Sequence, residues 1–154
     1  MIIDLPPGTG DVQLTLAQKI PVSGAIIVTT PQDIALLDAR KGLKMFEKVE
    51  VPVLGIVENM SLHICSKCGN EESIFGEGGG ASLANESKVD LLGKLPLDIS
   101  IREQTDTGKP SVINDPDGRI AEIYTEIARK AVGKLAAQSK DYSSKFPKIV
   151  IDNN

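Results

Sequence analysis

The chain has 154 residues, of which 41% are hydrophobic and 25% charged, which is the composition of an average globular domain. It excludes a disordered, collagen-like or coiled-coil chain and predicts one domain over residues 1–137, followed by a polar tail over residues 138–154. Because 17 Lys and Arg stand against 21 Asp and Glu, with 3% aromatic residues and no basic block, we expect no nucleic-acid partner.

Short apolar runs alternate with segments of helical spacing along the chain. The runs 24–29 and 52–57 contain no charged side chain, which is typical of strands buried on both faces of a parallel sheet. The expected fold class is therefore α/β, an open, mostly parallel sheet with helices on both faces. In chain order we expect a strand at 1–4, a helix at 11–20 and a strand at 24–29. A helix capped by Asp33 follows, with Ile34, Leu37 and Leu43 on its buried face. We then expect a strand at 52–57, a long functional loop at 60–80, a helix from about residue 81, a strand at 91–95 and a helix at 120–135.

Asp4 follows an apolar run and is expected at the carboxyl edge of the sheet, where open α/β folds bind ligands. A carboxylate there could hold a hydrated Mg²⁺ ion. Gly8 and Gly10 would let backbone N–H groups approach a phosphate, since neither carries a Cβ atom. A strand end followed by a Pro-Gly turn explains the same residues equally well.

The two cysteines form a single C-x-x-C motif, Cys65 and Cys68, which has the bite needed for zinc or an iron–sulfur cluster. Such sites take four ligands, so the other two are expected from another chain, most simply across a two-fold axis. His63 could be a third ligand, although an exposed loop histidine accounts for it as well. Two cysteines, no secretory leader and no apolar run near the ~18 residues of a membrane helix indicate a cytoplasmic protein with no membrane segment.

Asn59 ends the expected strand at 52–57, where its carboxamide could both donate to and accept from the edge of an adenine base. A simple turn residue is the alternative interpretation. The glycine run from Gly76 to Gly80 lacks a following Lys-Ser/Thr pair, so we expect a flexible segment there and not a phosphate-binding loop.

Several segments together resemble the Mrp/ApbC family of iron–sulfur cluster carriers, which are relatives of the MinD-type deviant-Walker P-loop ATPases. They are Asp4–Asp11, Pro31–Leu36, Glu58–Ser61, Cys65–Cys68, Gly93–Asp98, Arg102-Glu103 and Gly108–Pro110. The resemblance covers Met1 to about Leu135 and implies a P-loop NTPase-like fold. It also implies an ATP-dependent homodimer that carries a [4Fe–4S] cluster between two C-x-x-C pairs and passes it to apo iron–sulfur proteins.

The resemblance also implies a role for each matching residue. Asp4 would be the carboxylate on the Mg²⁺ side, and Gly8 and Gly10 would belong to the switch segment that senses the γ-phosphate. Asn59 would bind adenine, with Pro96, Leu97 and Asp98 as the opposite wall. Cys65 and Cys68 would be the cluster ligands.

The chain departs from this family in one respect, because no G-x-x-x-x-G-K-[S/T] loop occurs in its 154 residues. We therefore expect it to correspond to the C-terminal portion of a longer protein, truncated at the N-terminus of the domain. Whether the chain is an enzyme stays open at this point. The alternatives are a dimerisation module that holds zinc or a cluster without ATPase activity, and a zinc site that only joins two chains.

The missing loop leads to a first prediction. The Walker A loop supplies the N–H cradle and the lysine charge that hold a triphosphate, so we expect the purified chain neither to bind ATP tightly nor to hydrolyse it. Phosphate release with Mg²⁺ and ATP should stay at background, measured beside a longer relative that contains the loop. Sustained turnover by the 154-residue chain would contradict this expectation.

Overall fold

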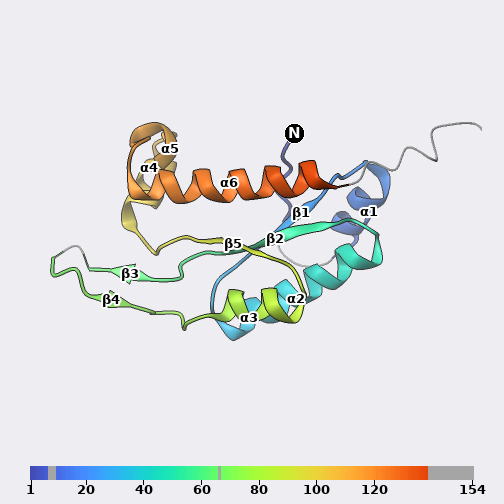
Figure 1. The fold of residues 1–154 in the computed structure, drawn as a ribbon, viewed down its shortest axis with the longest axis horizontal. Coiled ribbons are helices and arrows are strands. Elements are labelled where there is room, and N and C mark those ends of the chain that lie inside the picture. Colours follow the sequence, from blue (N-terminus) through green and yellow to red (C-terminus); the bar gives the residue numbers. More distant parts are fainter. Residues whose placement is uncertain (7–9, 66, 139–154) are drawn as a thin grey trace, which may run out of the picture.

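The computed structural model describes residues 1–6, 10–65 and 67–138. A three-stranded parallel sheet forms the body, and a two-stranded antiparallel hairpin projects from one end of it (Figure 1). The strands are β1 (Ala25–Thr29), β2 (Val53–Glu58) and β5 (Leu91–Lys94) in the sheet, with β3 (His63–Ile64) and β4 (Glu71–Glu72) in the hairpin. The α/β fold class predicted from the sequence is confirmed.

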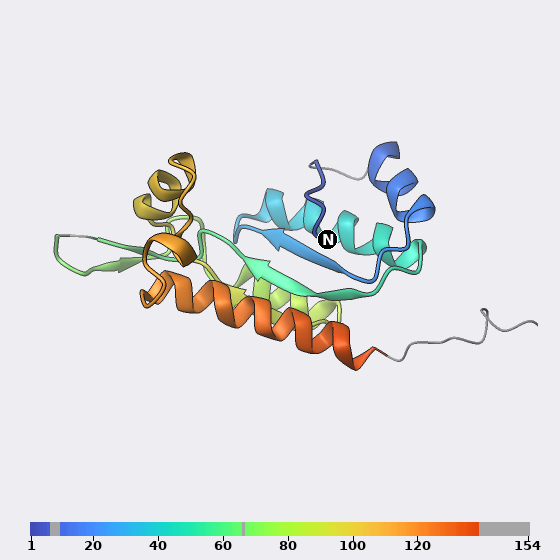
Figure 2. The ribbon, with the colours of Figure 1, turned by 90° about the horizontal axis from the view of Figure 1, so that it is seen from above.

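Helices cover both faces of the sheet, with α6 on one face and α2 and α3 on the other (Figures 1 and 2). The helices are α1 (Asp11–Lys19), α2 (Asp33–Lys48), α3 (Gly79–Glu86), α4 (Ile99–Asp106), α5 (Ser111–Asn114) and α6 (Arg119–Ala137). None of them, within the described residues, is long and apolar enough to cross a membrane.

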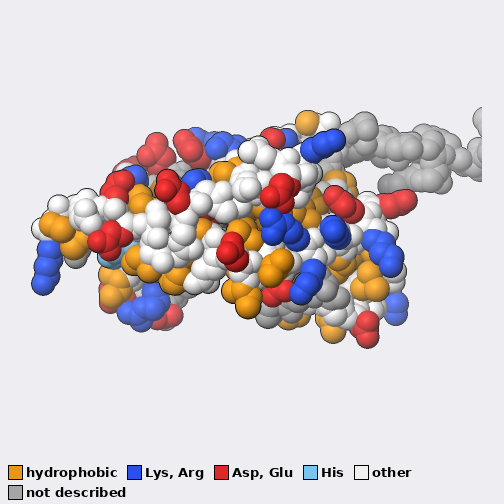
Figure 3. Space-filling model, turned by 90° about the horizontal axis from the view of Figure 1, so that it is seen from below, with side chains coloured by type: hydrophobic (Ala, Val, Ile, Leu, Met, Phe, Trp, Pro, Cys, Tyr) orange, Lys and Arg blue, Asp and Glu red, His pale blue; other side chains and the backbone are white. Residues whose placement is uncertain are grey.

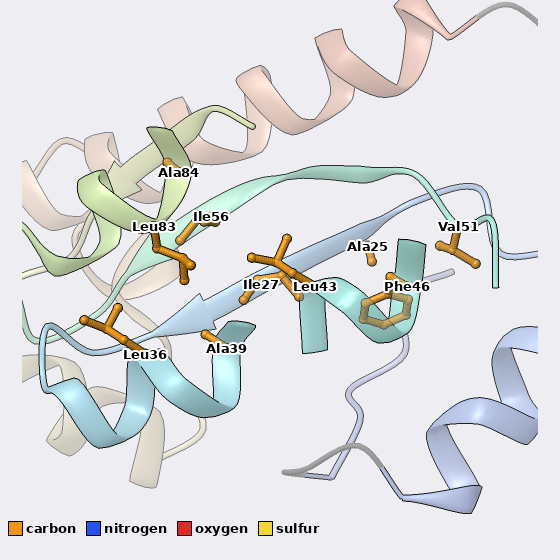
Figure 4. Close-up of a cluster of buried hydrophobic side chains, with 10 residues drawn as sticks. All are labelled: Ala25, Ile27, Leu36, Ala39, Leu43, Phe46, Val51, Ile56, Leu83 and Ala84. Atoms are coloured by element: carbon orange, nitrogen blue, oxygen red, sulfur yellow. The ribbon is translucent and has the colours of Figure 1, made fainter. Parts of the chain in front are cut away.

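The core lies in two layers because successive side chains of β2 point to opposite faces. Ile56, 0% exposed, packs in the cluster under α2 and α3, whereas Val57, 4% exposed, packs in the cluster under α6. Figure 4 shows Leu43 and Leu83 directed at β1 and β2 from the helical side of the larger cluster. The sequence therefore gives β2 apolar side chains on both faces, as a central strand requires.

The three parallel strands end side by side. Their order is β1-β2-β5, and Thr29 lies opposite Glu58, which in turn lies opposite Lys94. The carboxyl ends of the strands thus form one edge, and the chain leaves this edge after β2 to form the hairpin, which begins at His63. Open α/β sheets place their ligands at such an edge.

The expected strand over residues 1–4 is wrong. Met1 and Ile2 are 104% and 98% exposed, and within the described residues β1 pairs with β2 alone. An apolar run forms a strand only where a neighbouring strand can pair with its N–H and C=O groups, and residues 1–4 have none here. Only Leu5 of this region packs against the core.

The buried face of α2 was also predicted incorrectly. Ile34 and Leu37 are 74% and 54% exposed, while Leu43 is buried as expected. The helix begins after Gln32 as its N-cap, not at an Asp33 cap, and the inward face follows a 3.6-residue period from Leu36. The residues on that face are Leu36, Ala39, Leu43 and Phe46.

The segment from Met60 to Gly80 is more regular than the expected loop, since it contains β3, β4 and the start of α3. The short helices α4 and α5 were not predicted. On the face seen in Figure 3, acidic and basic side chains are interspersed without a large block of either sign.

The burial of β2 leads to a prediction about stability. Replacing Ile56 by Ala should lower the free energy of unfolding by about 2–5 kcal/mol, because it leaves a cavity in the central strand. Ile34→Ala is the matched control, since that side chain is 74% exposed, and should change it by less than about 0.5 kcal/mol. Urea denaturation of the two variants measures both values, and equal losses would contradict the core described above.

Candidate functional site

The two cysteines lie at the tip of the hairpin, which projects beyond the sheet (Figure 1). Its strands pair antiparallel, with His63 opposite Glu72 and Ile64 opposite Glu71. Both cysteines are free thiols; Cys65 is half-buried and Cys68 is exposed. The hairpin therefore presents a pair of sulfur ligands to the outside of the molecule.

Backbone hydrogen bonds hold the cysteine turn closed. The Cys65 N–H donates to the carbonyl of Asn70 at 2.9 Å, and the Gly69 N–H donates to the carbonyl of Cys65 at 2.8 Å. Gly69 has φ of 72°, a left-handed conformation that glycine adopts without strain. This turn brings the backbone back toward the first cysteine.

The same turn stabilises a thiolate. The backbone N–H groups of Lys67 and Cys68, and then the Cys68 side chain, hold the pKa of the Cys65 thiol below its ordinary value. Slight burial and the carboxylate of Glu72 act in the opposite direction and are outweighed. Thiolate is the form that binds metals, so the backbone N–H groups favour the form of Cys65 that can bind a metal or cluster.

The His63 side chain faces Leu97 and not the cysteine pair, so it does not act as a third ligand here. Its Nδ1 atom lies 3.2 Å from the carbonyl oxygen of Leu97, at the root of the hairpin. Across the described parts of the chain, no group of three or more His, Cys, Asp or Glu side chains is placed to hold a metal. The cysteine pair therefore offers two ligands of its own.

The hairpin root is bonded to the segment after β5. The Ser61 N–H donates to the carbonyl of Leu95 at 2.9 Å, and the Leu97 N–H donates to the carbonyl of Leu62 at 2.8 Å. Residues 95–97, which contain two of the three expected adenine-wall residues, thus lie directly against the cysteine hairpin.

Pro96 and Asp98 line a cavity of about 560 Å³ at the base of the hairpin. Its wall also contains the buried Ser111 hydroxyl and the Gln104 Oε1 atom, neither of which has a hydrogen-bond partner among the described residues. Asp98 is the N-cap of α4, and its Oδ1 atom accepts from the Ser100 N–H at 2.8 Å. The cavity is large enough for a small organic ligand.

Asn59 does not line this cavity. Its N–H donates to the carbonyl of Thr29 at 2.7 Å, and its Oδ1 atom accepts from the Met60 N–H at 3.0 Å. Asn59 therefore continues the carboxyl edge between β1 and β5, and its side-chain amide nitrogen has no hydrogen-bond partner among the described residues.

Of the residues expected around a phosphate, Asp4 and Gly10 belong to no strand of the sheet. Asp4 is exposed, lies outside the sheet and makes no hydrogen bond or ion pair in the described part of the chain. Gly10 is the N-cap of α1, and Gly8 falls outside the described residues. The structure gives Asp4 no ligand-binding partner.

The glycine run was expected to be a flexible segment, and its last two residues, Gly79 and Gly80, begin α3. A Cβ atom on Gly79 would lie 2.6 Å from Leu36 Cδ1, and one on Gly80 would lie 2.8 Å from Glu58 Oε2. These glycines allow close packing at the start of α3. The buried carboxylate of Glu58 accepts a hydrogen bond from Gly80, and no role was predicted for it from the sequence. The signal that could have identified it is a carboxylate at the end of an apolar strand.

Solved structures with the same fold define the class. A nucleotide-binding protein from Archaeoglobus fulgidus in complex with ADP matches 78% of this chain and 48% of its own, with TM-score 0.65 and 36% identity. The cell division ATPase MinD of Pyrococcus furiosus matches 73% of this chain and 43% of its own, with TM-score 0.57 and 26% identity. The chain is thus an α/β protein with a MinD-like, P-loop NTPase fold and a projecting cysteine pair.

The chain belongs to the family described as ParA, NUBPL iron-transfer P-loop NTPase, whose model matches residues 1–132. It is 64% identical over 128 residues to the iron–sulfur cluster carrier protein of Pseudomonas fragi, covering 83% of this chain and 45% of that relative. It is 53% identical over 135 residues to the iron–sulfur cluster transfer protein NUBPL of Mus musculus, covering 88% and 42%. The chain spans less than half the length of these relatives.

The thiolate turn leads to a prediction about pH. In metal-free Cys68→Ser chain, alkylation of Cys65 should have its midpoint at a lower pH when the chain is folded than in urea. The reason is that the N–H donors that lower the pKa of Cys65 exist only in the folded turn. By linkage, this contribution to stability is present above the unfolded pKa and is lost as the pH falls through the folded pKa. Equal midpoints in both states would contradict the geometry of the turn.

Proposed function

We propose that the chain carries a [4Fe–4S] cluster between the Cys65 and Cys68 thiolates of two copies and passes it to apo iron–sulfur proteins. The observation that carries this proposal is the projecting C-x-x-C turn, in which backbone N–H groups favour the thiolate of Cys65. The iron-transfer family and the cluster-carrier relatives support it. In this proposal the cluster is cargo, so the site must both bind and release it.

The proposed carrier is a homodimer, because a [4Fe–4S] cluster takes four cysteine thiolates and each chain offers two. The tip projects from the body, which leaves it accessible to the same tip of a second copy across a two-fold axis. The free thiols also fit a reducing compartment, so the proposal includes a cytoplasmic location.

The longer relatives of this chain support a nucleotide site as part of the proposal. The family is one of P-loop NTPases, and the similar Archaeoglobus fulgidus protein is in complex with ADP. We propose that Asn59 and residues 96–98 contribute the adenine side of such a site, while Asp4, Gly8 and Gly10 belong to its Mg²⁺ and γ-phosphate side. The cavity lined by Pro96 and Asp98 supports the assignment of these two residues, although Asn59 does not line it. A Walker A loop would have to supply the grip on the triphosphate.

The alternative is a module that dimerises around zinc or a cluster and has no ATPase activity. A tetrathiolate site serves both metals, and Cys65 and Cys68 meet the requirement of either. The metal content of the reconstituted dimer separates the two candidates.

The test is anaerobic reconstitution of the purified chain with iron and sulfide, followed by size-exclusion chromatography. We expect a brown dimer with about four irons per two chains. Cys65→Ser and Cys68→Ser should each abolish cluster uptake, while His63→Gln should retain it, because His63 faces Leu97 and not the cysteine pair. Zinc in a colourless dimer would support the alternative, and a chain without metal would contradict both candidates.

A further inference from the structure

One buried carboxylate stands out among the acidic side chains. Glu58 is 1% exposed and is among the largest fully buried side chains in the described part of the molecule. It is the last residue of β2, so it lies at the edge from which the cysteine hairpin leaves. A carboxylate is costly to bury unless charge-assisted hydrogen bonds replace its water.

Both carboxylate oxygens of Glu58 have partners. Oε2 accepts from the Gly80 N–H at 2.6 Å, and Oε1 lies 3.5 Å from the Nζ atom of Lys94, whose side chain is 45% exposed. Gly80 is in the first turn of α3, where the partial positive charge of the helix favours an anion. The Gly78 N-cap supplies no side-chain hydrogen bond, so Glu58 serves this helix end instead.

The bond between Glu58 and Gly80 joins the end of β2 to the start of α3, the two elements that flank the cysteine hairpin in the chain. These residues are 22 apart in the sequence, and every residue of β3, the cysteine turn and β4 lies between them. A Cβ atom on Gly80 would stand 2.8 Å from Glu58 Oε2, so the backbone approaches the carboxylate as closely as glycine alone permits. The hairpin entry is tied separately, through Ser61 and Leu62 to residues 95–97.

We propose that Glu58 is a positioning residue for the cysteine pair, because its carboxylate joins the start of α3, which follows the hairpin, to the end of β2 and thereby fixes where the two thiols stand. Lys94 balances the charge on the other oxygen. The proposal rests on the proposed function, since the thiols need a fixed place only if they hold a shared cluster. It assigns no contact between Glu58 and the cluster.

The experiment compares Glu58→Ala and Glu58→Gln with a matched control, Glu86→Gln. Glu86 is a half-exposed carboxylate at the end of α3, and it pairs with Arg40 at 2.9 Å. Amide hydrogen exchange of the metal-free chain reports on the hairpin and on α6 separately. Iron content, cluster half-life and the electron paramagnetic resonance spectrum of the reduced cluster report on the thiols after reconstitution.

Glu58→Ala should speed hydrogen exchange at Cys65 and Gly69 about tenfold while α6 keeps its protection, because a charge-assisted hydrogen bond is lost only at the hairpin base. The same variant should shorten the half-life of the cluster about tenfold and broaden its resonance spectrum. Glu58→Gln, which keeps an oxygen for the Gly80 N–H, should recover most of both properties. The Glu86→Gln control should match the wild-type chain.

Unchanged hairpin exchange in Glu58→Ala would overturn the proposal, as would an equal rise over α6, which indicates general destabilisation. A localised rise with unchanged cluster properties would also overturn it. A rise in exchange confined to the hairpin of Glu58→Ala, together with a wild-type chain that takes up no iron, would contradict the proposed function. It would support only the anchoring of the hairpin by Glu58.

Discussion

Every strand pairing in the parallel sheet involves β2, which pairs with β1 on one side and β5 on the other. Its side chains also belong to both cores, with Ile56 under α2 and α3 and Val57 under α6. β2 therefore contributes side chains to both helical layers, as β5 does through Leu91 and Leu92. Because side chains alternate along a strand, a shift of β2 by one residue would reverse both faces at once.

This constraint extends to the candidate sites. The register that buries Ile56 and Val57 also places Glu58 between Thr29 and Lys94 and directs its carboxylate to α3. The next residue, Asn59, then continues the edge by donating to Thr29. The cysteine hairpin begins a few residues later. Core packing thus determines where the chain leaves the sheet and which polar groups remain at the edge.

The sequence predicted what depends on continuous local patterns and missed what depends on distant partners. The runs at 24–29 and 52–57 became β1 and β2 because each has an adjacent strand to pair with. β2 is buried on both faces, whereas the prediction of two buried faces was wrong for β1, in which Ile26 and Val28 are 40% and 62% exposed. The run at 1–4 has the same apolar signal but no adjacent strand to pair with in the described chain. The cysteine motif could be predicted from its spacing. The role of Glu58 could not, because it requires Gly80, 22 residues away.

The hairpin itself could not be predicted because its strands have two residues each, too few for an alternating pattern. Strands of that length do not hold a fixed geometry by themselves, since a lone hairpin is at best marginally stable in water. Two hydrogen bonds flank them at the sheet: Leu97 bonds Leu62 before β3, and Glu58 bonds Gly80 in the helix that follows β4. Both bonds belong to the carboxyl edge of the sheet, beside the cavity lined by Pro96 and Asp98. The cysteine pair and the proposed adenine side therefore rest on the same few backbone segments.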